Sequence, residues 1–171
     1  MKNPIVTAQG RGRGRDAELA PEGPEHAWAV LGWIGIVFVA VGGVDFALTW
    51  YPTAFGNREW EFGTVTQSFN GLPILVLGIG LVSAAGGATR ARWWGLVATA
   101  AAVGVLLCVM IGFLLWVRTV PLALATVPVE LGPGVRKAVW KTSIQALAYA
   151  AVSSYLMVRS WGAFRAPRPG R

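Results

Sequence analysis

The chain has 171 residues, and its composition excludes an ordinary soluble protein. Apolar residues make up 54% of it and charged residues only 13%, whereas soluble domains average about 25% charged residues. A mean hydropathy of +0.53 and nine tryptophans also indicate a membrane protein. One cysteine and one histidine are too few for an internal disulfide, a CxxC pair, a bis-histidine haem or a cysteine- and histidine-rich zinc site.

Residues 1–26 are expected to form a disordered cytoplasmic tail, because they are polar and show no apolar period. The Arg-Gly alternation from Arg11 to Arg15 is followed by four acidic residues. We interpret the segment as a flexible tail without a specific ligand, the alternative being a weak contact with RNA or lipid. It does not have the order of a signal peptide, since the acids precede a long, late apolar run.

Four apolar stretches follow, and about 20 apolar residues are needed for a helix to cross a bilayer. The expected spans are residues 27–49, 72–88, 95–117 and 139–158. Trp28, Trp33, Trp50 and Tyr51 lie near the ends of the first span, where membrane interfaces favour aromatic rings. We therefore expect an all-α integral membrane protein, a four-transmembrane-helix bundle over residues 27–161, followed by a basic tail over 162–171.

The first loop, residues 50–71, is expected to hold a short helix at the membrane surface. Asn57 can cap it, with Glu59 and Glu61 near its positive end. Spacings of three and four place one apolar stripe on this helix, formed by Phe62, Val65 and Phe69. Pro73 predicts the start of a new helix, and the prolines and glycines of residues 118–138 predict a second, irregular loop.

Basic residues determine the expected orientation. Ten lie on the side of the two termini and of the turn at Arg90 and Arg92, and five lie on the opposite side. The positive-inside rule therefore places both termini in the cytoplasm and the two longer loops outside. Twelve arginines against three lysines, with many Ala and Gly residues, are typical of a GC-rich bacterial genome. We expect a multi-pass protein of the bacterial cytoplasmic (inner) membrane.

Asp45 is the only acidic residue inside an apolar stretch, and an ionisable residue in a membrane marks a functional candidate. Lys141 begins the fourth span and Arg118 ends the third, so both are expected at the same outer depth as Asp45. A structural Asp45–Lys141 or Asp45–Arg118 pair is the first interpretation. An exposed interfacial aspartate and an ion or proton site are the alternatives.

The two outer loops carry opposite charges and are expected to dock. Glu59 and Glu61, with Trp60 between them, lie in the first loop, while Arg136 and Lys137 lie in the second. Exposed ion pairs of this kind contribute only about 0–1 kcal/mol each. A catalytic carboxylate pair is disfavoured, because residues two apart on a helix do not face each other.

Small residues repeat every four positions and predict helix packing faces. They are Gly104, Cys108 and Gly112 on the third span, and Gly80 and Ala84 on the second. Cys108 is then a small packing residue rather than a reactive thiol. The fourth span carries several polar residues, which indicate interhelical hydrogen bonds or, alternatively, a lined pathway.

The segment Asn57-Arg58-Glu59-Trp60-Glu61, followed by Asn70-Gly71-Leu72-Pro73-Ile74-Leu75-Val76-Leu77-Gly78, resembles the HpsJ-like four-helix bacterial membrane proteins. These have an Asn-Pro-Glu-Trp-Gln-type segment after the first span and a Pro-Leu-Gly-type start to the second. Here Arg58 replaces the proline and Glu61 the glutamine. The resemblance implies an accessory role in surface polysaccharide export, with no catalytic residues to carry over.

No nucleophile–base pair, phosphate loop or metal cluster can be assembled from the sequence. We therefore expect a non-catalytic accessory, assembly or scaffold subunit without a cofactor. Its expected partners are the bilayer, anionic lipid at the basic cytoplasmic segments, and a membrane protein or a second copy, but no nucleic acid. The alternatives are a small transporter or channel subunit using Asp45 and the polar fourth span, and a lipid-modifying enzyme using Glu59 or Glu61.

Overall fold

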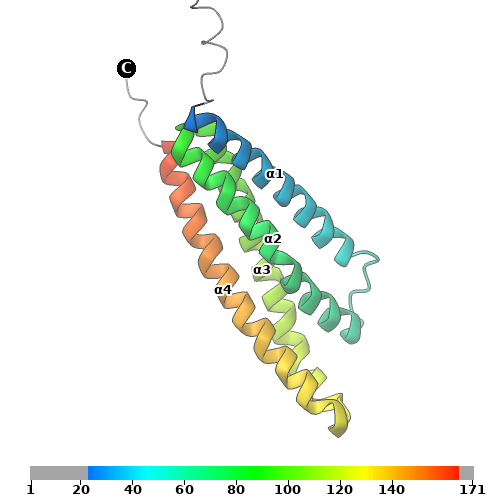
Figure 1. Cartoon of the computed structure of the whole chain (residues 1–171). Helices are drawn as coiled ribbons and strands as arrows, with labels where there is room; N and C mark the ends of the chain where they lie inside the picture. Colours follow the sequence, from blue (N-terminus) through cyan, green and yellow to red (C-terminus); the bar gives the residue numbers. More distant parts are fainter. Residues whose placement is uncertain (1–22, 166–171) are drawn as a thin grey trace, which may run out of the picture.

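The computed structural model describes residues 23–165, which form four long helices in antiparallel order (Figure 1). The helices are α1 (Pro24–Thr49), α2 (Arg58–Thr89), α3 (Arg92–Thr126) and α4 (Gly132–Arg165), with a single 3-10 turn, η1 (Val129–Leu131), before α4. The predicted all-α class is confirmed for this part of the chain. Apart from residues 23–26 and 162–165, the two predicted tails lie outside the described residues.

Three helices are long and apolar enough to cross a membrane, namely α1, α2 and α3. Length and composition therefore support three of the four predicted spans. Helix α4 has 34 residues, more than the length needed, but its polar residues keep it below the hydropathy of a typical span. The structure nevertheless packs α4 closely along α3.

Helix α2 lies at the centre of the bundle and packs against each of the other three helices. Figure 1 shows α1 and α4 on opposite sides of α2, and these two helices do not pack against each other. Helix α1 begins at the same end of the bundle at which α4 ends. A chain that crosses a membrane an even number of times must have its first and last helices begin and end on the same side, as they do here.

The α1–α2 contact is a close crossing of two backbones at glycine. A Cβ atom added to Gly35 would lie 2.7 Å from the carbonyl oxygen of Gly78, and one added to Gly78 would lie 2.7 Å from that of Gly35. About two turns along α1, a Cβ on Gly42 would lie 3.0 Å from the Cβ of Leu75. Such close approach maximises van der Waals contact, which drives helix association in lipid where the hydrophobic effect does not.

Trp94 closes the end of the bundle at which α1 and α3 begin. Its side chain is only 2% exposed, and its ring occupies the space that a side chain at Gly32 would need. Gly86 of α2 contacts the same residue, because a Cβ there would lie 3.1 Å from the Cβ of Trp94. Trp94 therefore joins three helices, with its ring against Gly32 of α1 and its Cβ against Gly86 of α2.

The prediction of a separate short surface helix in the first loop is wrong. Residues 58–71 form the first part of the continuous helix α2. Its apolar stripe faces the other helices, with Val65 and Phe69 buried in the core and Phe62 stacked on Trp116 at 4.8 Å. Pro73 does not start a new helix. Proline removes one hydrogen bond, but a transmembrane helix tolerates the loss where neighbouring helices hold it in place.

The prediction of an irregular loop over residues 118–138 is also wrong, because most of these residues are helical. Helix α3 continues through Pro121 to Thr126, and α4 begins at Gly132. Val120 and Val139 pack against the core, so tertiary contacts outweigh the helix-breaking tendency of this sequence. Figure 1 shows the resulting α3–α4 hairpin extending well beyond the loop that joins α1 to α2.

Candidate functional site

Asp45 lies exposed on α1, beside α2 rather than among basic residues. A Cβ atom at Gly71 would lie 2.8 Å from its Oδ2 atom, and the Thr49 hydroxyl donates a hydrogen bond of 2.9 Å to its backbone carbonyl oxygen. Within residues 23–165 the structure does not pair Asp45 with Lys141 or Arg118, both of which are exposed. Helix α2 separates α1 from α4, so Asp45 and the polar fourth helix do not line one path.

Glu61 has a structural role that the sequence reasoning missed. It is 4% exposed, and its Oε1 atom accepts a hydrogen bond of 2.9 Å from the backbone N–H of Gly56. Gly56 has φ +94°, a conformation that favours glycine. The only sequence signal for this contact is a glycine in the turn directly before an N-cap and a carboxylate five residues later.

Asn57 caps α2 as predicted. Its Oδ1 atom accepts hydrogen bonds from the backbone N–H groups of Glu59 at 3.1 Å and Trp60 at 3.2 Å. The side chain thereby satisfies two of the N–H groups that a helix start leaves without partners. Together with the Glu61 contact, this cap fixes the entry of the chain into α2.

The segments of the two predicted outer loops are neighbours, but not through the predicted charge pairs. Glu59, Arg136 and Lys137 are exposed, and no ion pair joins them in the described part of the chain. Instead, Arg58, Glu59 and Phe62 at the start of α2 lie across a cavity of about 330 Å³ from Leu131 and Val135. The contact between the two segments is therefore largely apolar.

Trp60 belongs to an aromatic cluster at the end of the bundle where α1 ends and α2 begins. Its ring lies 6.0 Å from that of Trp50 and 5.4 Å from that of Phe55, in edge-to-face geometry. Phe46 extends the cluster on α1, with its ring 5.9 Å from Trp50. The cluster joins the end of α1 to the start of α2, which gives Trp60 a packing contact within its own chain.

The predicted small-residue faces are only partly at helix contacts. No atom lies within 4 Å of a Cβ added at Gly80 or Gly104. A Cβ added at Gly112 would lie 3.5 Å from the ring of Phe69. Cys108 and Ala84 are half-buried. The closest contacts involve other glycines, and a spacing of seven residues could have revealed them: Gly35 and Gly42 on α1, Gly71 and Gly78 on α2.

Helix α4 is joined to its neighbours by polar side chains. The buried hydroxyl of Ser160 donates a hydrogen bond of 2.9 Å to Ser83 of α2, and the indole N–H of Trp116 donates one of 3.2 Å to Ser143. These bonds account for part of the polar composition of α4. Three further buried hydroxyls have no hydrogen-bond partner among the described residues: Ser68, Thr142 and Ser153.

The described residues, 23–165, contain no group of three or more His, Cys, Asp or Glu side chains that could hold a metal ion. Comparison of the chain with protein-family models, curated proteins and solved structures finds no match. The resemblance of segment 57–78 to the HpsJ-like proteins therefore stays a prediction.

Proposed function

We propose that this chain is a non-catalytic accessory, assembly or scaffold subunit of the bacterial inner membrane. It crosses the membrane four times, with both termini in the cytoplasm and the end at which α3 and α4 are joined on the outside. The observation that carries the proposal is the projecting end of this hairpin (Figure 1). We call residues 119–141, which include this end, the hairpin tip.

The hairpin tip exposes apolar side chains that no part of the described chain covers. Val129 is 93% exposed and Trp140 72% exposed, and Leu131 is also exposed. Arg136 and Lys137 lie beside them, also exposed. Large exposed apolar side chains with charged residues between them in the sequence are typical of a surface that binds another protein. We therefore assign the hairpin tip to contact with a membrane-protein partner.

The packing of α4 supports its assignment as the fourth span. Polar side chains on its inner face bond to α2 and α3, as described for Ser143 and Ser160. Large apolar side chains face outward and are exposed along the same helix: Ile144, Leu147, Val152 and Val158. A helix with this distribution is suited to lipid on one side and to interhelical hydrogen bonds on the other.

The four-span topology predicts a labelling pattern for single cysteines introduced into a Cys108→Ser background. A membrane-impermeant maleimide is expected to label Glu130→Cys in spheroplasts with an intact inner membrane, because residue 130 lies at the hairpin tip. Ala88→Cys and Gly162→Cys should react only after permeabilisation. All three positions are exposed. Labelling of both Glu130→Cys and Gly162→Cys in intact spheroplasts would show that α4 does not cross the membrane.

A partner test uses a tagged chain extracted in mild detergent or directly into lipid nanodiscs. We expect a membrane protein to co-purify at a fixed ratio, and the double variant Val129→Ser/Leu131→Ser to lower its recovery about tenfold, which corresponds to a loss of about 1.4 kcal/mol. Ala125→Ser, another exposed position of the tip, is the matched control. Recovery of the bare chain under several mild conditions would contradict the scaffold role.

The HpsJ-like resemblance directs the first search for this partner. Components of surface polysaccharide export are the first candidates to look for among the co-purifying proteins. A partner of another kind would leave the scaffold role in place and would remove the basis for this family connection.

A further inference from the structure

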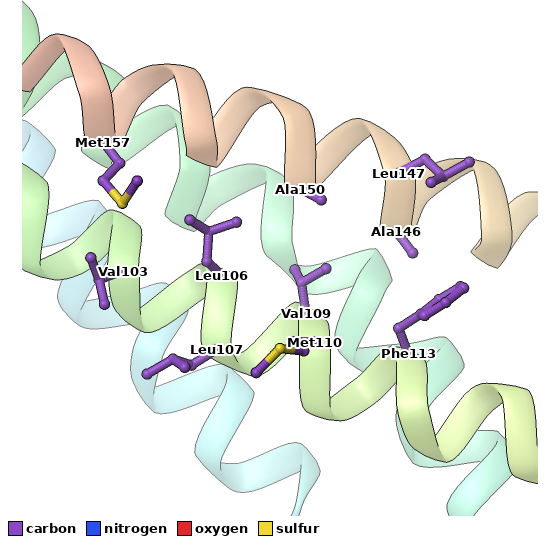
Figure 2. Close-up of a pocket in the computed structure, with 10 residues that line it drawn as sticks. All are labelled: Val103, Leu106, Leu107, Val109, Met110, Phe113, Ala146, Leu147, Ala150 and Met157. Atoms are coloured by element: carbon purple, nitrogen blue, oxygen red, sulfur yellow. The ribbon is translucent and has the colours of Figure 1, made fainter.

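An apolar groove runs along the outside of the bundle between α3 and α4 (Figure 2). Its volume is about 370 Å³, and only hydrophobic side chains line it. Ala150 of α4 points across it toward Val109 of α3, and Ala146 points toward Phe113. Because alanine is short, the two helices leave a channel open here instead of closing on each other.

The face of α4 that lines the groove continues to a cationic side chain. Ala146, Ala150, Met157, Trp161 and Arg165 follow one another at spacings of four, seven, four and four residues. These spacings place them along one face of a helix. The Arg165 guanidinium lies 4.6 Å from the centre of the Trp161 ring. The groove therefore leads from an apolar channel past an aromatic ring to an exposed positive charge.

The length of the groove matches one leaflet of a bilayer. Ala146 and Met157 are 11 residues apart, which is about 16 Å along a helix axis at about 1.5 Å per residue. Half of a hydrocarbon core about 30 Å thick is about 15 Å. Trp161 then lies one turn beyond the groove, at the depth that interfacial tryptophans favour, and Arg165 lies one further turn out.

The cross-section of the groove distinguishes a lipid chain from a helix. A volume of about 370 Å³ spread over about 16 Å gives a cross-section of about 23 Å², whereas a helix about 10 Å wide occupies about 80 Å². A single acyl chain fits inside this channel, whereas a partner helix could lie only across its opening. The apolar lining also excludes a polar headgroup from the groove itself.

The charges at this end of the bundle favour an anionic headgroup. Four arginines lie there among residues 23–165, at positions 90, 92, 159 and 165, against one acid, Glu25. Arginine binds phosphate through charge-assisted hydrogen bonds, and the cytoplasmic leaflet of a membrane supplies anionic lipid.

We propose that α3 and α4 form a binding site for one anionic phospholipid of the cytoplasmic leaflet. One acyl chain lies in the groove against Ala146 and Ala150, and the phosphate is bound by Arg165. The site rests on the proposed placement of α4 in the bilayer beside α3. It does not depend on the scaffold role or on any partner protein.

Native mass spectrometry of the purified full chain in detergent tests the site, with dioleoyl phosphatidylglycerol as the anionic probe and dioleoyl phosphatidylcholine as the zwitterionic one. We expect one phosphatidylglycerol to be retained in preference to phosphatidylcholine. Ala150→Leu fills the groove and should weaken binding of phosphatidylglycerol about tenfold. The matched control Ala148→Leu changes an exposed alanine on another face of α4 and should bind as the parent chain does.

The headgroup contact is tested separately, at a position where folding is not at risk. Arg165→Gln should abolish the preference for phosphatidylglycerol. Arg159→Gln should keep it, because Arg159 lies on another face of α4, where it bonds to the Tyr155 hydroxyl at 3.2 Å. Equal retention of the two lipids by the parent chain would overturn the proposal. An Arg165→Gln chain that still prefers phosphatidylglycerol would also do so.

Failure of the scaffold role and failure of the lipid site give different results. If no partner co-purifies but phosphatidylglycerol is retained through Arg165, only the scaffold role is lost. If a partner binds at the hairpin tip and lipid binding shows no preference, only the lipid site is lost. Labelling of both Glu130→Cys and Gly162→Cys from outside would remove α4 from the bilayer and the lipid site with it.

Discussion

Gly78→Leu is expected to separate α1 from α2 and to lower the stability of the bundle by at least about 3 kcal/mol, the upper end of the range for overpacked sites. The atoms nearest the new Cβ include the Gly35 carbonyl oxygen at 2.7 Å and the Val39 backbone nitrogen at 2.9 Å. Backbone atoms cannot rotate away as a flexible side chain can. The helices must therefore move apart and lose van der Waals contact along the crossing.

Thermal unfolding in detergent, followed by circular dichroism, measures this loss. Gly80→Leu is the matched control, since it makes the same change of residue in the same helix, at a position where no atom lies within 4 Å of the added Cβ. It should unfold close to the temperature of the parent chain. Equal destabilisation by the two substitutions would contradict this prediction, since the higher helix propensity of leucine cannot destabilise either variant and only Gly78 lies at the α1–α2 crossing.

Trp94→Ala is expected to cost about 3–5 kcal/mol, the range for removing a buried aromatic ring from a packed core. The ring is 2% exposed and fills the space beside Gly32, and its backbone and Cβ contact Gly86. Because Gly32, which faces the ring, has no side chain to move into the vacated volume, the cavity cannot be filled by a small adjustment.

The neighbouring residue provides the control for Trp94. Trp93 stacks on Trp94 with ring centres 3.7 Å apart, but its side chain is 43% exposed. Trp93→Ala should therefore lower the unfolding temperature much less than Trp94→Ala in the same detergent. Equal unfolding temperatures of the two variants would contradict the conclusion that Trp94 holds α1, α2 and α3 together.

The two proposed contact surfaces lie at opposite ends of the α3–α4 hairpin. The hairpin tip projects on the side of the α1–α2 loop, and Arg165 lies where α4 ends, at the other end of the bundle. A partner at one end and a lipid at the other would hold the same pair of helices. Variants at one surface are expected to leave binding at the other unchanged, which keeps the two sets of experiments independent.

Local chemistry was sufficient to predict the helices and one of their boundaries. Apolar stretches of about 20 residues must form helices in lipid, because every backbone N–H and C=O group needs a partner within the segment. Asn57 was identified as a cap for the same kind of reason, since its side chain reaches only the N–H groups of the next few residues. Neither prediction requires knowledge of what lies across the bundle.

Contacts between helices decided the rest, because they depend on which faces meet. Pro73 and Pro121 lie within continuous helices, where packed neighbours offset the missing hydrogen bond. Gly35 and Gly78 meet while Gly80 and Gly104 face open space, although all four are glycines in apolar helices. Asp45 has no basic partner in the described structure because α2 lies between its helix and that of Lys141, a separation that no spacing along the chain encodes.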